Sequence, residues 1–311
     1  MSKPLLWMTA GFGWCATSPL AYTLQYNSKY VSSGYFKEGP FLWCLDKFYR
    51  INGPKKNEKH ESRWTYRENM LQKLKELAAI KIEDTPRCQQ HRFNADDYVP
   101  NLDKIWVEPY TFDQYIDYLY ATWDVVKENG YKGVADFGNA KRWLSEEFWE
   151  ENANKLKEHF DVKVGIIVRD PIRRAWSGNY TRHSGDVSKI FHKNDSGFDY
   201  LPAFERYNKH FDTILLVMEE LWEGDGSEKK RLESFIDYKL GDLHRNMYAP
   251  DRGHLIDEID PNLTDQSEKL PELTPELYME MREGLYAPVY EEWKNRFGKL
   301  PLYWGAPLEY K

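Results

Sequence analysis

Residues Val162–Ser177 read VKVGIIVRDPIRRAWS and join an apolar segment to an arginine-rich stretch. The part Val164–Val168 lacks polar–apolar alternation, as expected of a strand covered by helices on both faces. Asp170 and Pro171 suit the cap and the first position of a helix. The stretch therefore predicts a buried parallel strand followed directly by a helix, with Arg169 at the edge where parallel sheets bind ligands.

Strands and helices are expected to alternate along the rest of the chain. Apolar runs predict further strands at 5–9, 133–136 and 213–218, and helical spacing predicts helices at about 111–127 and 145–160. This alternation indicates an α/β fold of three layers, with a central, mostly parallel sheet flanked by helices. We expect one domain over 1–311, with a divergent, substrate-facing insertion at about 47–109, where the alternation is weakest.

Composition limits the class of protein. The 311 residues include 43 Lys and Arg against 50 Asp and Glu, a net charge of -7, which disfavours general nucleic-acid binding. Three scattered cysteines fit neither a disulfide framework nor a metal site. The apolar N-terminus imitates a signal peptide but is interrupted by Gly11, Gly13 and Thr17, and no run reaches the roughly 18 apolar residues of a membrane span. We expect a cytoplasmic chain.

The turn after the first predicted strand, Gly11–Ser18, reads GFGWCATS. It has the length of the nucleotide-binding loop G-x-x-x-x-G-K-[ST], but Ala16 replaces the second Gly and Thr17 replaces the Lys. That loss disfavours a P-loop nucleotide kinase. Backbone N–H groups at the start of a helix near Pro19 still suit a phosphate cradle. The alternative is a plain β-turn in which Ser18 caps the helix.

The arginines after the buried strand offer a second anion site. Arg169 lies at the strand end, and Ser177 lies two turns into the predicted helix. We expect both side chains to converge on one phosphate through charge-assisted and hydroxyl hydrogen bonds. The alternative is an amphipathic helix whose arginines are solvated.

The string R-D-P-x-x-R-A-x-S is similar to the 3′-phosphate-binding motif of the sulfotransferases that use 3′-phosphoadenosine 5′-phosphosulfate (PAPS). The loop also resembles their 5′-phosphosulfate loop, K-x-G-T-[TS]-x-L. Four other segments resemble the Golgi and bacterial carbohydrate branch of that family: Lys37–Leu42, Asp136–Ala140, Val217–Leu221 (as a strand) and Leu285–Trp304. The resemblance runs from Leu5 to Trp304 outside the insertion.

The resemblance implies a P-loop-like fold and an enzyme that moves a sulfuryl group from PAPS to a hydroxyl of a saccharide and releases 3′-phosphoadenosine 5′-phosphate (PAP) without a metal. It implies that Arg169 and Ser177 bind the 3′-phosphate and that Arg252 and Gly253 cover the nucleotide. The implied 5′-phosphosulfate loop consists of Gly13, Trp14, Cys15, Ala16, Thr17 and Ser18. Glu38 matches the general base that takes the proton from the acceptor hydroxyl.

The sequence departs from the family pattern at two positions where the family has a positive charge. Trp14 and Phe137 stand where the family has lysines that stabilise the leaving oxygen. The candidate replacements are Lys37, Lys141, Arg142 and Arg173. Asp136 either orients a neighbouring cation or acts as the general base. His60 is a further candidate for the general base. The departures keep a catalytically impaired PAPS- or glycan-binding protein open as an alternative.

Overall fold

The computed structural model describes residues 3–12, 15–33, 42, 111–138, 141, 144–183, 200–241, 243 and 273–306. The predicted insertion at 47–109 lies outside these ranges, so its fold and the single-domain organisation stay predictions. In the described part of the chain, no helix has the length and apolar character needed to cross a membrane.

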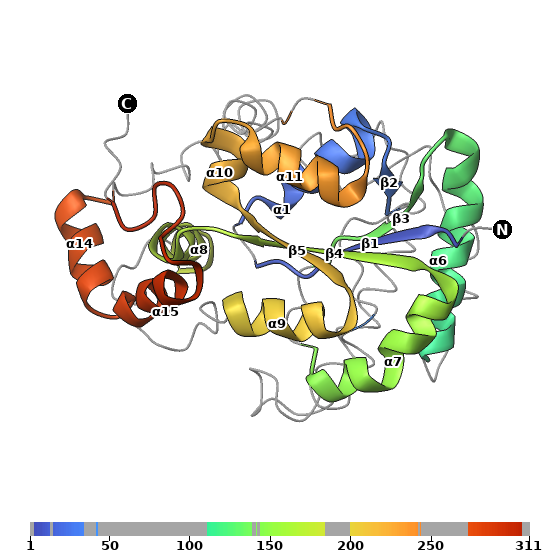
Figure 1. Ribbon diagram of the computed structural model, residues 1–311, viewed down its shortest axis with the longest axis horizontal. Helices are drawn as coiled ribbons and strands as arrows, with labels where there is room; N and C mark the ends of the chain where they lie inside the picture. The colour runs from blue at the N-terminus through green and yellow to red at the C-terminus, as the bar shows by residue number, and fades with distance from the viewer. Residues whose placement is uncertain are drawn as a thin grey trace. The chain divides into compact units, whose positions relative to one another are not determined.

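Within the described residues, five strands form one parallel sheet in the order β2-β3-β1-β4-β5. They are β1 (Leu5–Thr9), β2 (Val31–Ser32), β3 (Gly133–Asp136), β4 (Asp161–Val168) and β5 (Asp212–Val217). In register, Gly133 of β3 pairs with Leu5 on one side and with Val31 on the other. Helices flank the sheet (Figure 1), which confirms the predicted α/β class.

The chain divides into two compact units, and the first comprises 1–10, 21–164 and 209–212. Its described helices are η1 (Thr23–Asn27), α6 (Phe112–Val126), η4 (Lys127–Asn129) and α7 (Glu146–His159). Helix α6 begins with a capping box in which Thr111 and Gln114 bond each other's backbone N–H, and α7 begins at a Ser145 cap. Both helices bury large aromatic residues, among them Tyr115 and Trp149.

The second unit comprises 11–20, 165–208 and 213–311. Its elements include α1 (Thr17–Tyr22), α8 (Pro171–His183), α9 (Tyr200–His210), α10 (Met218–Glu223), α11 (Ser227–Ile236), α14 (Pro275–Glu283) and α15 (Ala287–Phe297). In Figure 1, α11 lies on one side of β5 and α9 on the other. Arg231 of α11 donates to the carbonyl of Leu215, so α11 is bonded directly to the strand.

Two boundaries differ from the sequence prediction. Helix α1 begins at Thr17, two residues before Pro19, because Ala16 turns the chain and its carbonyl accepts from Leu20 N–H at 3.2 Å. Residues 217–221 are not a continuous strand: β5 ends at Val217, whose N–H donates to Glu228 at 3.0 Å, and α10 follows at once. The side chain of Glu228 thus accepts the hydrogen bond from the last backbone N–H of the strand.

Candidate anion-binding site after β1 and β4

The order of the strands reverses between β1 and β4. Chain connections leave β1 toward β2, whereas those from β4 lead to β5 on the opposite side of the sheet. Ligands of open α/β sheets bind at such a switch point, outside the carboxyl ends of the strands. The residues that follow β1 and those that follow β4 belong to the same compact unit.

Arg169 and Ser177 come together after β4. The Arg169 Nη1 donates to Ser177 Oγ at 2.9 Å, and both side chains are half-buried. The hydroxyl of the fully buried Tyr200 donates to the Arg169 carbonyl at 2.9 Å, which fixes the backbone beneath the guanidinium. The expected convergence is therefore observed, while the role of the pair in phosphate binding stays a prediction.

The turn after β1 contains a left-handed residue. Ala16 has φ 55°, a region that costs an L-residue roughly 1–2 kcal/mol. This is the position of the second Gly in the nucleotide-binding loop, where such a backbone is easily adopted. Cys15 is fully buried and Thr17 is 5% exposed. A left-handed residue followed by a helical one turns successive N–H groups toward a common point, which suits an anion.

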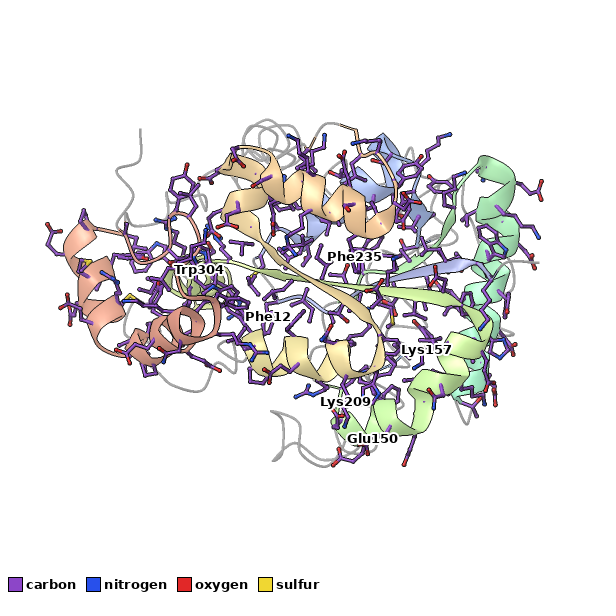
Figure 2. All side chains as sticks on the ribbon, in the orientation of Figure 1. Phe12, Glu150, Lys157, Lys209, Phe235 and Trp304 are labelled. Atoms are coloured by element: carbon purple, nitrogen blue, oxygen red, sulfur yellow. The ribbon has the colours of Figure 1, made fainter. Side chains whose placement is uncertain are left out.

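Helices α8 and α9 hold the start of this turn. The guanidinium carbon of Arg174 lies 5.5 Å from the ring centroid of Phe12, within cation–π range. Phe12 is labelled in Figure 2, and the ring of Tyr200 meets it edge to face, with centroids 4.6 Å apart. All three side chains are buried, so the turn is packed against both helices.

Asp170 is the centre of a buried hydrogen-bond network. Its Oδ1 accepts from the N–H groups of Ile172 (3.1 Å) and Arg173 (3.0 Å), which confirms the predicted helix cap. Its Oδ2 accepts from three further groups at 2.8, 2.8 and 3.3 Å: Tyr278 Oη, Tyr290 Oη and Gly305 N. The motif Asp thus joins the start of α8 to α14, α15 and the segment after α15.

Glu219 completes the network from α10. Its Oε1 accepts from Asp170 N–H and its Oε2 from Nε1 of Trp304, both at 3.0 Å, and Trp304 is labelled in Figure 2. Burial raises the pKa of Glu219 above its ordinary value, the Trp304 hydrogen bond opposes the rise, and the nearby Asp170 adds to it. The folded chain therefore holds a proton on Glu219 more tightly than the unfolded chain does.

Arg173 is committed to the same network. Its Nη2 donates to the Ala306 carbonyl at 2.9 Å, and its guanidinium lies 5.7 Å from the Tyr278 ring centroid. It is 5% exposed. Arg173 was a candidate for the missing cation, but these contacts direct it to the segment after α15.

Asp136 lies in the first unit, at the end of β3. It accepts from Lys141 Nζ at 2.5 Å, from Tyr115 Oη at 2.9 Å and from Gly138 N–H at 3.0 Å. Burial and the nearby Asp136 raise the pKa of Tyr118. The ion pair with Lys141 and the hydrogen bond from Tyr115 engage both carboxylate oxygens, so the contacts favour orientation of Lys141 over general-base action. Phe137 beside it is fully buried.

The remaining expected site residues lie outside the described part of the chain. They are Gly13, Trp14, Lys37, Glu38, His60, Arg142, Arg252 and Gly253, and the side chain of Ser18 joins them. Among the described residues, no group of three His, Cys, Asp or Glu side chains could hold a metal ion.

Sequence reasoning missed the residues that pack around the motif. Tyr278, Tyr290 and Trp304 contact the Asp170–Glu219 pair from far along the chain, and Arg174 contacts the turn after β1. The usable signal was the resemblance of Leu285–Trp304 to a family segment. It indicated that the C-terminal residues belong to the fold, but not that they bond the motif.

Comparisons with known proteins find few matches. No family model matches the sequence, and no curated protein matches it. Among solved structures, a sulfotransferase from Alicyclobacillus acidocaldarius is similar in fold, with a TM-score of 0.46 and 14% identity over 97% of this chain and 98% of that chain.

The left-handed turn makes a prediction about stability. Ala16→Gly removes the cost of a left-handed Ala, offset in part by the larger entropy that Gly loses on folding, so we expect a gain of about 0.5 kcal/mol in unfolding free energy. The control Ala16→Val places a branched side chain in the same conformation and should destabilise. Urea denaturation measures both. A Gly variant less stable than the wild type would contradict a left-handed Ala16.

The raised pKa of Glu219 makes a prediction about pH. Its proton stabilises the fold below the ordinary Glu pKa of 4.5, and that contribution is lost as pH rises through the raised pKa. The side chain of Glu219→Gln does not titrate, so this variant should not lose the contribution. Between the ordinary pKa of Glu and the raised pKa of Glu219, the slope of unfolding free energy against pH should therefore change by up to about 1.4 kcal/mol per pH unit. Trp304→Phe, which removes the opposing hydrogen bond, should extend the window upward. Identical pH curves for all three proteins would refute the assignment.

Proposed function

We propose that the chain is a PAPS-dependent sulfotransferase that transfers a sulfuryl group to a hydroxyl of a saccharide. The observation that carries the proposal is the Arg169–Ser177 pair, joined at 2.9 Å where β4 ends. It supports the family resemblance because two residues of the R-D-P-x-x-R-A-x-S string, eight positions apart, meet at the edge where a nucleotide phosphate would bind. The saccharide rests on the resemblance to the carbohydrate branch.

Arg169 and Ser177 bind the 3′-phosphate in this proposal. A guanidinium presents five N–H donors in a rigid fork, and one Nη1 bond to Ser177 fixes the direction of that fork. A hydroxyl that accepts from arginine can donate its own hydrogen to an anionic oxygen. The pair therefore offers charge-assisted and neutral hydrogen bonds to one phosphate group.

The 5′-phosphosulfate binds the loop Gly13–Ser18 through backbone N–H groups. The left-handed Ala16 supports this assignment, since a left-handed residue followed by a helical one turns successive N–H groups toward a common point. Arg252 and Gly253 cover the nucleotide. We assign PAPS as the co-substrate, PAP as the product and the cytoplasm as the location.

The chemical step is an in-line displacement at sulfur. The acceptor hydroxyl oxygen attacks sulfur while Glu38 takes its proton, and the bond from sulfur to the bridging phosphate oxygen breaks. That oxygen leaves with the electron pair as part of PAP, so a positive group near it lowers the barrier. Lys37 remains a candidate, and Asp136 orients Lys141. A binding protein without turnover is the second candidate, favoured by the apolar Phe137 buried at a family lysine position.

The 3′-phosphate site predicts a preference between nucleotides. In calorimetric titration without magnesium, PAP should bind tightly and ADP weakly. Arg169→Ala should weaken PAP binding by about 2–3 kcal/mol, because a charged donor is lost. Arg296→Ala, which removes an exposed arginine 3.2 Å from Glu205, is the charge-matched control and should bind as the wild type does. Equal affinity for PAP and ADP, or no loss in a folded Arg169→Ala, would exclude the assignment.

The general base makes a separate prediction. Glu38→Gln should lower the rate of sulfuryl transfer by about 100-fold or more, as for loss of a general base, with little change in PAP affinity. The rate is measured as PAP release from PAPS over a panel of saccharide acceptors. Turnover that survives in Glu38→Gln would move the base to another residue. A wild type that binds PAP but transfers to no acceptor would favour the binding protein.

A further inference from the structure

Arg174 is a buried cation on helix α8. It is 2% exposed, and its backbone N–H donates to the Asp170 carbonyl at 2.9 Å within the first turn. A charge taken out of water costs several kcal/mol unless its surroundings compensate for it. Such a residue is expected to have a specific task.

Its guanidinium faces the turn after β1. The Phe12 ring centroid lies 5.5 Å from the guanidinium carbon, and Phe12 is 1% exposed. The Tyr200 ring contacts the same Phe12 ring edge to face, with centroids 4.6 Å apart. Arg174 therefore holds the residue that immediately precedes Gly13 in the proposed 5′-phosphosulfate loop.

The positive charge of Arg174 also acts on the buried hydroxyl of Tyr200. Burial raises the pKa of Tyr200 well above its ordinary value, the nearby Cys15 adds to the rise, and Arg174 opposes it. Cys15 belongs to the loop itself. Phe12, Cys15, Arg174 and Tyr200 thus lie within one electrostatic neighbourhood of a single compact unit.

The other described candidates for the missing cation are directed elsewhere. Lys141 contacts Asp136 at 2.5 Å, and Arg173 donates to the Ala306 carbonyl at 2.9 Å. Arg174 differs from both because its guanidinium contacts Phe12, the residue that immediately precedes the loop.

We propose that Arg174 is a positioning residue for the 5′-phosphosulfate loop: it fixes Phe12 through a cation–π contact and supplies positive charge to the loop in place of the lysines missing at Trp14 and Phe137. This inference rests on the proposed PAPS site and names a residue that serves its 5′ end. It assigns Arg174 no contact with the nucleotide.

The test compares two ligands that differ only at the 5′ end. PAP carries 3′- and 5′-phosphates, whereas adenosine 3′-monophosphate lacks the 5′-phosphate. The ratio of their dissociation constants, measured by calorimetry, reports what the loop contributes. In Arg174→Gln we expect this ratio to shrink by about tenfold, through weaker PAP binding, with adenosine 3′-monophosphate affinity unchanged. Arg174→Lys should restore part of the ratio, because it keeps the charge above the Phe12 ring.

A second variant keeps the test decisive if Arg174→Gln fails to fold. Phe12→Leu retains Arg174 and removes the aromatic face, so it should also shrink the ratio. An unchanged ratio in folded variants, or an equal loss for both ligands, would overturn the positioning role and leave the PAPS assignment standing. A wild type that does not prefer PAP to ADP would overturn both proposals together.

Discussion

The carboxylate of Asp170 is the interaction on which the candidate site depends. It is fully buried, and a buried carboxylate is tolerated only when hydrogen bonds replace its hydration. Five donors from the start of α8, from α14, from α15 and from the segment after α15 provide that replacement. Segments far apart in the sequence are thereby fixed around one group, and the direction of α8 is set with them.

The consequences appear at the neighbouring arginines. Arg169 precedes the anchored residue and directs its guanidinium to Ser177, while Arg174 lies one turn into the helix and faces Phe12. Both directions follow from the helix that Asp170 anchors. A binding site built on such a rigid element holds its donors in place before the ligand arrives, which is the condition for strong electrostatic stabilisation.

Local sequence patterns predicted the scaffold well. Apolar runs located β1, β3, β4 and β5 to within one residue, and the Asp170–Pro171 pair predicted the start of α8. The partners of Asp170 could not be predicted in this way, because Tyr278, Tyr290 and Gly305 lie 108, 120 and 135 residues away. The sequence hint of the left-handed φ of Ala16 was its place at the second Gly of the nucleotide-binding loop, since Ala itself gives no local signal for it.

Moving the positive charge from the loop to a helix has a physical consequence in the proposed scheme. A lysine within a loop is a mobile, strongly hydrated charge, whereas an arginine packed on a ring is planar, weakly hydrated and always protonated. Arg174 sits on α8 and is nearly inaccessible to water, so its field at the loop varies little with pH or salt. The scheme exchanges the closer approach of a lysine to the leaving oxygen for a charge of fixed position. Such an exchange favours binding of the 5′ end, and the barrier to transfer then depends on the remaining cations.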